Sequence, residues 1–441
     1  MADLQNKKIA VLGLGVSGQS AARFLRKLGA KVICVDQDIA QAGPQALYQE
    51  GFELIAEQNW DANCELAVVS PGISLTHPLC QRLAKNGIEL IGEIELAARE
   101  LDQPCIGITG TNGKTTVTLL VAHILNCAGI QACALGNVGT PLTQALLEKK
   151  HERVIFVIEL SSYQLESMST ACLDAGVILN ITPDHLDRYN YSMEEYAKAK
   201  CRIQRLLRPN SPLFAFQSVI DEFGKQLRMD TCIAYGYSDS CAYCLTPRGI
   251  EYRGEIELAY PASLLRLAPH DYENFAAAYA LCKKYGVSKE KFLLGLRSFK
   301  KPPHRIEFVS EVAGVKYYDD SKGTNVDAVI KAVESMPANV VLIAGGLDKG
   351  SPFKHWVSGF NGKVSHIFAI GQAAATIQEQ LKGKLTVDIC SSLEEAVLSA
   401  SKKASPGECV LLSPGCASTD MFKNYAHRGE VFKQTVLQLQ T

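Results

Sequence analysis

A loop rich in glycine and threonine, with one lysine, stands between an apolar segment and a helix-like segment. It covers residues 109–116 (TGTNGKTT), follows a predicted strand at 105–108 and precedes a predicted helix at 117–125. Such a loop directs backbone N–H groups, a helix N-terminus and a lysine at nucleotide phosphates. Although the first glycine of the strict GxxxxGK[ST] pattern would fall on Ile108, the arrangement predicts an ATP site with Lys114 on the phosphates.

Two further side chains are predicted at the same sheet edge. Glu159 ends a predicted strand at 154–158, and His185 follows one at 177–181. Ligands of open α/β sheets bind outside the carboxyl ends of the strands. The hydroxyl of Thr115, directly after Lys114, can share a Mg²⁺ ion with the Glu159 carboxylate. A surface glutamate and a structural histidine would satisfy the same pattern.

Lys200 is predicted on the apolar face of a helix. A capping box at residues 192–195 (SMEE) opens a predicted helix through about residue 207, and Tyr196, Lys200 and Ile203 share one face of it. Desolvation of an ammonium depresses its pKa, and a neutral amine can react with CO₂ to form a carbamate, an anionic oxygen ligand for Mg²⁺. A snorkelling lysine fits this geometry equally well.

The N-terminal segment carries a second glycine loop, residues 13–18 (GLGVSG), after a predicted strand at 9–12. Asp36 ends the next strand, at about the spacing of a ribose-binding acid. Taken alone, this fingerprint indicates NAD or FAD. The fingerprint indicates only that the backbone can come close to a diphosphate, so a UDP-sugar fits it as well. No hydride-transfer groups accompany it.

Composition narrows the class of protein. The chain has 441 residues, 47% of them hydrophobic and 21% charged, with a formal net charge of −1. This predicts several domains and no basic face for nucleic acid. No signal peptide or membrane-spanning segment is predicted, so we expect a cytoplasmic protein without membrane insertion. The fifteen cysteines are expected to be thiols, and the lone CxxC at 241–244 is a weak metal or redox signal.

Apolar, β-branched segments alternate with helical patterns along the chain, which predicts α/β domains built on mainly parallel sheets. We expect three: a Rossmann-like domain at 1–95, a P-loop ATPase-type domain at 96–300 and a Rossmann-like domain at 301–441. The segment Lys300-Lys301-Pro302-Pro303 suits a hinge. Polar, glycine-rich sequence follows nearly every predicted strand, so the three domains are expected to direct loops at shared ligands.

Seven motifs together resemble the Mur ligases, the ATP-dependent amino-acid ligases of peptidoglycan precursor synthesis. They are residues 109–114, 136–139 (GNVG), 159–162 (ELSS), 184–188 (DHLDR), 199–200 (AK), 304–307 (HRIE) and 320–325 (DSKGTN). The glycine loop at 13–18 and the segment 413–422 (SPGCASTDMF) are similar to the D-glutamate-adding members. The resemblance covers all three predicted domains.

The resemblance implies a role for each candidate residue. The ATP phosphates and nucleoside would contact Gly110, Thr111, Asn112, Gly113, Lys114, Thr115, Thr116, Asn274, Arg305 and Asp320, with Lys322 near the reacting phosphate. Two Mg²⁺ ions would be held by Thr115 and Glu159, and by His185 and carbamylated Lys200. UDP-N-acetylmuramoyl-L-alanine would contact Val16, Ser17, Gly18, Asp36, Ser70, Asn137 and His185. D-Glutamate would contact Thr324, Lys349, Ser418 and Tyr425.

The implied reaction passes through an acyl phosphate in a monomeric enzyme, with Lys114, His185, Lys200 and Lys322 as its catalytic residues. Members usually carry asparagine in place of Asp271, which puts a detail of adenine binding in doubt. Another Mur ligase or a folylpolyglutamate-synthase-like ligase is the alternative. The latter does not need a UDP-type glycine loop. A nucleotide-gated binding protein or an oxidoreductase would show no phosphate release dependent on an amino acid.

Overall fold

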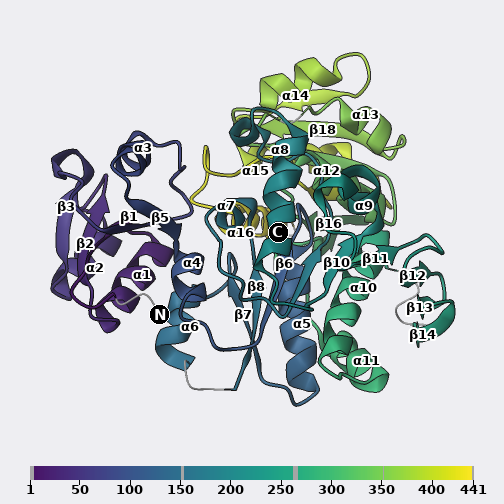
Figure 1. The fold of residues 1–441 in the computed structure, drawn as a ribbon. Coiled ribbons are helices and arrows are strands. Elements are labelled where there is room, and N and C mark those ends of the chain that lie inside the picture. Colours follow the sequence, from purple (N-terminus) through teal and green to yellow (C-terminus); the bar gives the residue numbers. More distant parts are fainter. Residues whose placement is uncertain (1–3, 150–152, 262–266, 351, 440–441) are drawn as a thin grey trace. The chain divides into compact units, whose positions relative to one another are not determined.

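The structure is a computed structural model that describes residues 4–149, 153–261, 267–350 and 352–439. Its strands form three sheets of five, nine and six strands, and most neighbouring strands within each sheet run parallel (Figure 1). The predicted fold class, three α/β domains on mainly parallel sheets, is confirmed.

The N-terminal sheet has the strand order β3-β2-β1-β4-β5 and is entirely parallel. Its strands are β1 (Lys8–Leu12), β2 (Lys31–Asp36), β3 (Glu53–Ala56), β4 (Leu66–Val69) and β5 (Glu89–Gly92), and its helices are α1 (Val16–Lys27), α2 (Ala42–Gln49), α3 (Pro78–Lys85) and α4 (Glu93–Ala98). Helix α1 packs on β1 and β2. On one side of the sheet, Ala10, Leu12 and Val35 pack with Cys80 and Leu83 of α3. The alternation of strand and helix therefore carries the glycine loop at 13–18 and Asp36, the last residue of β2, to one sheet edge.

The central sheet has the order β14-β13-β12-β11-β10-β9-β6-β8-β7. Its strands are β6 (Cys105–Thr109), β7 (Ala132–Gly136), β8 (Ile155–Glu159), β9 (Ala175–Ile178), β10 (Leu213–Phe216), β11 (Cys232–Gly236), β12 (Tyr243–Thr246), β13 (Gly249–Tyr252) and β14 (Glu255–Ala259). The helices are α5 (Lys114–Cys127), α6 (Leu142–Lys149), α7 (Ser162–Glu166), α8 (Met193–Cys201), α9 (Gln217–Phe223), α10 (Pro269–Lys284) and α11 (Lys289–Ser298). Helix α5 packs on β6, β7 and β8. The predicted ATP loop follows β6, which lies between β9 and β8.

An antiparallel extension, β12 to β14, was not predicted (Figure 1). The turn between β13 and β14 contains Arg253 and Gly254, both with positive φ (53° and 85°). Two left-handed residues are what a tight hairpin turn needs, but arginine at the first position hides the signal. The CxxC cysteines lie here: Cys241 donates to Gln217 Oε1 at 2.8 Å, and Cys244 is buried.

The C-terminal sheet has the order β15-β16-β20-β17-β18-β19, with only the β15–β16 pair antiparallel. Its strands are β15 (Glu307–Val312), β16 (Val315–Asp319), β17 (Val340–Gly345), β18 (Val364–Ile370), β19 (Val387–Ile389) and β20 (Cys409–Leu412), and its helices are α12 (Val326–Ser335), α13 (His355–Gly359), α14 (Ala374–Leu381), α15 (Leu393–Lys403) and α16 (Tyr425–Gln438). Apolar clusters cover both faces of this sheet, one around Trp356 and one around Phe432. Both faces are covered, as expected for a mainly parallel sheet.

Two predicted elements extend too far toward the C-terminus. The predicted strand at 177–181 is β9, which ends at Ile178 because Leu179 and Asn180 turn to hydrogen-bond the phosphate loop. The predicted helix at 192–207 is α8 only to Cys201, and residues 202–206 form a 3₁₀ turn. That turn positions Leu206, whose carbonyl oxygen accepts from the N–H groups of Cys172 and Leu173.

The chain divides into two compact units. The first contains residues 1–180, 197–259 and 273–299, and the second contains 181–196, 260–272 and 300–441. The first unit thus holds the N-terminal and central sheets, and the second holds the C-terminal sheet. The domain boundaries expected near residues 95 and 300 stay predictions.

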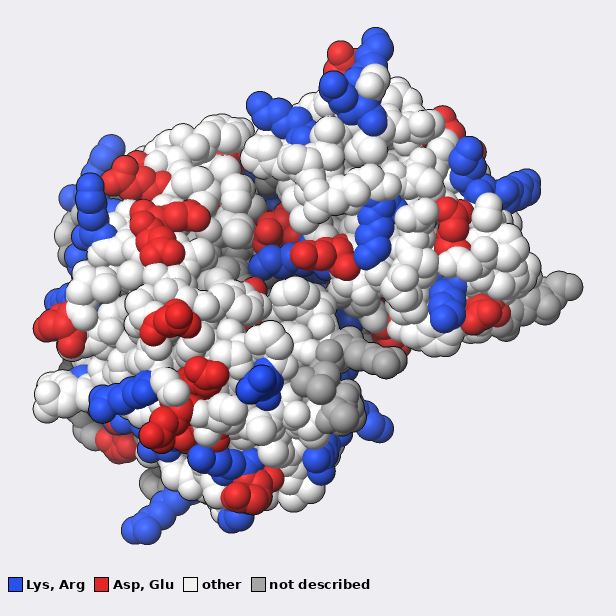
Figure 2. Space-filling view, turned by 90° about the vertical axis from the view of Figure 1, so that its right-hand side faces the viewer, with Lys and Arg blue, Asp and Glu red and all other residues white. Residues whose placement is uncertain are grey.

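The surface charges and the state of the cysteines match what the composition predicts. Figure 2 shows Lys and Arg side chains interspersed with Asp and Glu side chains over the visible face. All fifteen cysteines are free, as predicted. Among the helices that the structure describes, none is long and apolar enough to cross a membrane.

Candidate nucleotide and substrate sites

The phosphate loop joins β6 to α5 and is held by the residue after β9. Thr111 N donates to Asn180 O at 2.9 Å, and Asn112 N donates to Asn180 Oδ1 at 2.8 Å. Helix α5 begins at Lys114, three residues before the predicted start, with left-handed Gly113 (φ 84°) as its N-cap. A Cβ at Gly113 would lie 2.6 Å from Asn274 Oδ1, so glycine lets α10 approach the loop.

Two lysine side chains converge on the same loop carbonyl. Lys114 Nζ donates to Gly110 O at 2.9 Å and to Thr111 O at 2.7 Å. Lys200 Nζ donates to Gly110 O at 2.7 Å, and its residue is only 1% exposed. The burial predicted for Lys200 is confirmed, whereas the snorkelling alternative is wrong for this residue. Its ammonium contacts the loop rather than reaching solvent.

Glu159 ends β8, the neighbour of the strand that leads into the phosphate loop. β8 lies between β6 and β7, and Glu159 pairs with Ile108 on one side and Gly136 on the other. Glu159 Oε1 accepts from Asn137 Nδ2 at 2.8 Å. Glu159 Oε2 is buried and has no hydrogen-bond partner among the described residues. A buried, unpartnered carboxylate oxygen is costly, and a divalent cation would supply the missing contact.

In the N-terminal sheet, the glycine loop is built by close backbone approach. A Cβ at Gly18 would lie 1.9 Å from Gly13 O, so this position excludes every other residue without a shift. Ser70 Oγ donates to Gly13 O at 2.6 Å, and Asp36 Oδ2 accepts from Leu14 N at 2.6 Å. A Cβ at Gly15 would meet nothing within 4 Å. The loop therefore presents open backbone, which a diphosphate needs.

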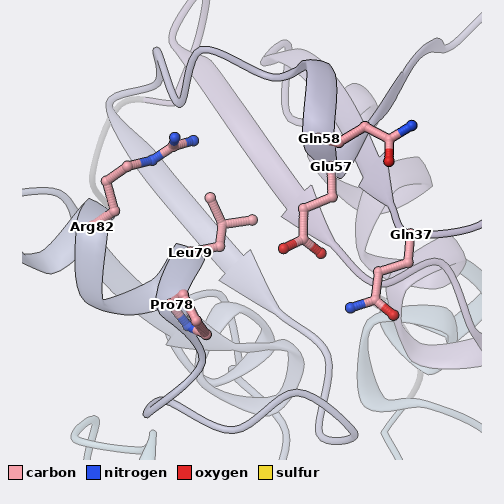
Figure 3. A pocket seen from close by; sticks show the side chains of 6 residues that line it. All are labelled: Gln37, Glu57, Gln58, Pro78, Leu79 and Arg82. Atoms are coloured by element: carbon pink, nitrogen blue, oxygen red, sulfur yellow. The ribbon is translucent and has the colours of Figure 1, made fainter.

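A cavity of about 270 Å³ opens beside this loop and continues into a shallower one of about 530 Å³. The first is lined by residues that include Gly13, Asp36 and His77. The second is lined by Gln37, Glu57, Gln58, Pro78, Leu79 and Arg82, whose side chains surround it in Figure 3. The two cavities share Gln37, Glu57 and Leu79. Sequence reasoning did not identify these residues, although Gln37 and Glu57 directly follow β2 and β3.

In the second unit, Asp320 and Lys322 lie in the loop after β16. Asp320 is buried and accepts from Ser413 Oγ at 2.7 Å. Burial raises the pKa of its carboxyl to about 7, an effect that hydrogen bonding to Ser413 and the charge of Arg305 oppose. Lys322 Nζ lies 3.9 Å from the centroid of the Tyr425 ring. The structure therefore brings Lys322, predicted near the reacting phosphate, next to Tyr425, predicted at the amino acid.

Lys349 and His185 also belong to the second unit. Lys349 Nζ donates to Asp184 Oδ1 at 3.2 Å, and Asn325 Nδ2 donates to Asp184 Oδ2 at 3.3 Å. His185 Nε2 lies 3.7 Å from Asp184 Oδ2. Asp184, which was not among the predicted site residues, is thus the side chain that organises two of them.

One more cluster has the donors of a metal site. Atoms of His304, Glu307 and Asp319 lie within 4.8 Å of one another. His304 Nδ1 is 2.6 Å from Asp319 Oδ2, and Lys433 Nζ is 2.9 Å from Glu307 Oε2. Because the imidazole and the Lys433 ammonium already contact both carboxylates, this cluster is explained without an ion. Asp271, the unusual residue near the predicted adenine site, pairs with Lys301 at 2.7 Å.

Comparison with known families gives three matches along the chain. They are the MurD-like N-terminal domain of Mur ligases at residues 7–92, the Mur ligase middle domain at 108–253 and the Mur ligase glutamate ligase domain at 304–416. The chain belongs to the Mur ligase family. The predicted family and its reaction class, ATP-dependent amide ligation, are confirmed.

Curated relatives match this Mur ligase over nearly its whole length. A UDP-N-acetylmuramoylalanine–D-glutamate ligase of Protochlamydia amoebophila is 46% identical, with 98% of both chains covered. One from Alkaliphilus metalliredigens is 38% identical, with 99% of both covered, and one from Chlamydia abortus is 35% identical, also with 99% of both covered.

Solved structures show the same fold at low identity. The UDP-N-acetylmuramate-alanine ligase MurC from Thermotoga maritima superposes with a TM-score of 0.62 at 17% identity, covering 98% of this chain and 100% of that one. MurF ligase from the same organism, a complex with ADP, gives 0.60 at 15% identity, covering 99% and 96%. At such identities, these likenesses support the fold.

Proposed function

We propose that this Mur ligase joins D-glutamate to UDP-N-acetylmuramoyl-L-alanine, with ATP and two Mg²⁺ ions, in peptidoglycan precursor synthesis. The observation that carries the chemistry is the unpartnered, buried Glu159 Oε2 at the edge that also bears the phosphate loop. The choice of substrates is supported by the full-length relatives, which are named for these two.

Amide formation from a carboxylate needs an activated acyl group. The γ-phosphoryl group of ATP moves to an oxygen of the alanyl carboxylate, ADP leaves, and an acyl phosphate forms. The amine of D-glutamate then attacks the acyl carbon, loses a proton, and phosphate leaves with the former carboxylate oxygen. Lys114 and the N–H groups of Gly110 and Gly113 stabilise the negative charge of the transferring phosphoryl. Thr111 and Asn112, whose N–H groups donate to Asn180, keep the loop in shape around it.

The donor set at the phosphate loop suits magnesium. Thr115 follows Lys114, and Glu159 offers a carboxylate oxygen without another partner. Hard oxygen ligands of this kind are what Mg²⁺ prefers. His185 and carbamylated Lys200 are proposed for a second ion. Bound magnesium would neutralise charge on the phosphates and the carboxylate.

The glycine loop and the cavities beside it are proposed to hold the uridine diphosphate end. Gly15 leaves the backbone open, and α1 directs its N-terminus at the same place. Val16 is 72% exposed and offers an apolar surface for a base. Ser17, Gly18, Asp36 and Ser70 complete this group, and Asn137 and His185 are proposed to face the acyl end.

The residues proposed to bind D-glutamate are Thr324, Lys349, Ser418 and Tyr425. Those proposed to bind the nucleotide, besides the phosphate loop, are Asn274, Arg305, Asp320 and Lys322. The Lys349 side chain is 17% exposed, and its ammonium already forms an ion pair with the Asp184 carboxylate. An ammonium has three N–H groups and can donate to more than one carboxylate, which suits a dicarboxylate substrate. The monomeric state expected above stays a proposal.

One assay tests the substrates. The protein is incubated with ATP, Mg²⁺ and UDP-N-acetylmuramoyl-L-alanine, and phosphate release is compared for D-glutamate, L-glutamate, L-alanine and L-lysine. We expect release with D-glutamate alone, together with the amide product by mass. Lys114→Ala should abolish both while the melting temperature is kept.

Other outcomes redirect the assignment. Release with L-lysine or L-alanine instead of D-glutamate would point to another Mur activity. Turnover of a folate-type acceptor in place of the UDP substrate would point to the folylpolyglutamate-synthase-like alternative. Full product yield from Lys114→Ala would contradict the ATP site.

A further inference from the structure

Three loops of the second unit carry most of the residues proposed for amino-acid binding. They follow β16, β20 and β17, which are neighbours in the sheet. Backbone hydrogen bonds join them: Gly415 N donates to Gly323 O at 2.8 Å, and Gly345 N donates to Pro414 O at 2.8 Å. Leu347 and Ala417 exchange bonds of 2.9 and 3.0 Å. The position of Ser418 therefore depends on how these loops pack on one another.

Arg428 of α16 lies beneath the junction of these loops and is 0% exposed. Its Nε donates to Ser321 Oγ at 3.0 Å, and Nη2 donates to Ser321 O at 2.8 Å. Both terminal nitrogens donate to Cys416 O at 3.2 Å, and Nη1 reaches Ala417 O at 3.4 Å. A Cβ at Gly346 would lie 3.2 Å from Nη1, so the third loop passes close to the guanidinium.

The same side chain reaches the N-terminus of its own helix. Ser321 Oγ accepts from Arg428 and donates to Tyr425 O at 2.7 Å. Tyr425 begins α16, and its ring packs against the Lys322 ammonium. One guanidinium thus connects the segments that present Lys322, Ser418 and Tyr425.

The chemistry of Arg428 is unusual for a buried charge. All five of its hydrogen bonds go to neutral oxygens, and no carboxylate of the described residues forms an ion pair with it. Desolvation lowers its pKa to about 10. Burying an unpaired charge is expensive, so a methionine or leucine of similar volume would serve better if the residue only filled space.

We propose that Arg428 is a positioning residue that sets the shape of the amino-acid pocket, and hence its affinity and selectivity for D-glutamate. This inference rests on the proposed function. The planar fork holds Ser321 on one side and residues 416–417 on the other at fixed separation, which a single ammonium on a flexible stem does not do. Arg428 itself acts only through these segments.

The experiment compares Arg428→Met, Arg428→Lys and a control, Val436→Ala, in the full-length protein. Val436 is a 0% exposed core residue two turns further along α16, so its truncation destabilises the same unit without removing any of the Arg428 hydrogen bonds. The readouts are melting temperature, the KM values for D-glutamate and ATP, and the ratio of kcat/KM for D-glutamate over L-glutamate. That ratio does not depend on the fraction of folded enzyme.

We expect Arg428→Met to raise KM for D-glutamate by about tenfold or more and to lower the selectivity ratio, because misplacement of binding groups by about 1 Å costs up to about 100-fold. The KM and the selectivity ratio of Arg428→Lys should lie between those of Arg428→Met and those of the wild type. Val436→Ala should lower the melting temperature and leave both kinetic readouts unchanged.

The proposal is overturned if Arg428→Met keeps the wild-type KM and ratio, whatever its melting temperature. Where a variant does not fold, Arg428→Lys decides by the same criterion. If the wild type itself fails to use D-glutamate, the proposed function is wrong. Positioning is then judged on the amino acid that it does use.

Discussion

Lys114 and Lys200 donate hydrogen bonds to the same acceptor, the carbonyl oxygen of Gly110, at 2.9 and 2.7 Å. One lysine comes from the first turn of α5, and the other from the last turn of α8. The phosphate loop is thereby touched by two cations, of which Lys200 is buried. Conversion of the Lys200 amine to a carbamate would replace one cation by an anionic oxygen donor at this point, which is the chemistry that a second metal ion requires.

Lys200→Ala should lose most ligase activity and regain part of it with added acetate or propionate. The reason is that a small carboxylate can occupy the truncated space and supply the oxygen ligand. Activity is measured as phosphate release with increasing carboxylate. Lys198 is an exposed lysine on the same helix, so Lys198→Ala is the matched control. This variant should keep its activity and should not be stimulated by added carboxylate. Full activity of unrescued Lys200→Ala would refute the carbamate.

Glu159→Gln should raise the magnesium concentration needed for half-maximal activity and lower kcat by about 100-fold, since the amide is a poorer ligand than a carboxylate. The Asn137 contact to Oε1 can persist, so the fold should be kept. Activity is measured as a function of magnesium concentration, and thermal melts check that the fold is kept. Glu148→Gln, on the exposed part of α6, is the control. An unchanged magnesium dependence would remove Glu159 from the metal site.

The site at the phosphate loop could be predicted because its signals are local. Glycines with positive φ, a lysine at the helix start and an acid at a strand end each have one physical reason, and parallel strands carry them to one edge. Lys200 could be predicted because helical periodicity places this charged residue on an otherwise apolar face of its helix.

The remaining features depend on tertiary packing. Asp184 is exceptional only because Lys349 and Asn325, more than 100 residues away, donate to it. Arg428 lies on a helix whose pattern does not distinguish a buried arginine from a solvated one. The end of β9 was mispredicted because Asn180 bonds to the loop of a neighbouring strand, and local β propensity does not report such a bond.

Asp320 predicts a pH dependence of stability. Its pKa is about 7 in the folded protein, above the usual value near 3.8. Between these values the folded state keeps a proton that the unfolded state has lost, so the unfolding free energy falls as pH rises through this window. The stabilisation is fully present below about pH 4 and lost above about pH 7.

Thermal melts of the wild type and Asp320→Asn from pH 4 to 8 measure this effect. We expect the variant to show a smaller decrease with pH, because asparagine does not titrate. Glu379→Gln, at an exposed position of α14, should retain the wild-type slope. Equal slopes for the wild type and Asp320→Asn would contradict the burial of an ionisable carboxyl at this position.

Gly15 and Gly18 should respond differently to the same substitution. A Cβ at Gly18 would lie 1.9 Å from Gly13 O, so Gly18→Ala must push the loop from α1 and lower the melting temperature. A Cβ at Gly15 meets nothing within 4 Å, and its φ of −66° suits any residue. Gly15→Ala should therefore melt like the wild type.

The two variants also separate folding from binding. If the diphosphate approaches the open backbone, the Gly15→Ala methyl group occupies that approach, and KM for the UDP substrate should rise by about tenfold with the KM for ATP unchanged. Melting curves with and without the UDP substrate complete the comparison, because the ligand should stabilise the wild type more than Gly15→Ala. A wild-type KM in Gly15→Ala would place the diphosphate elsewhere than on this loop.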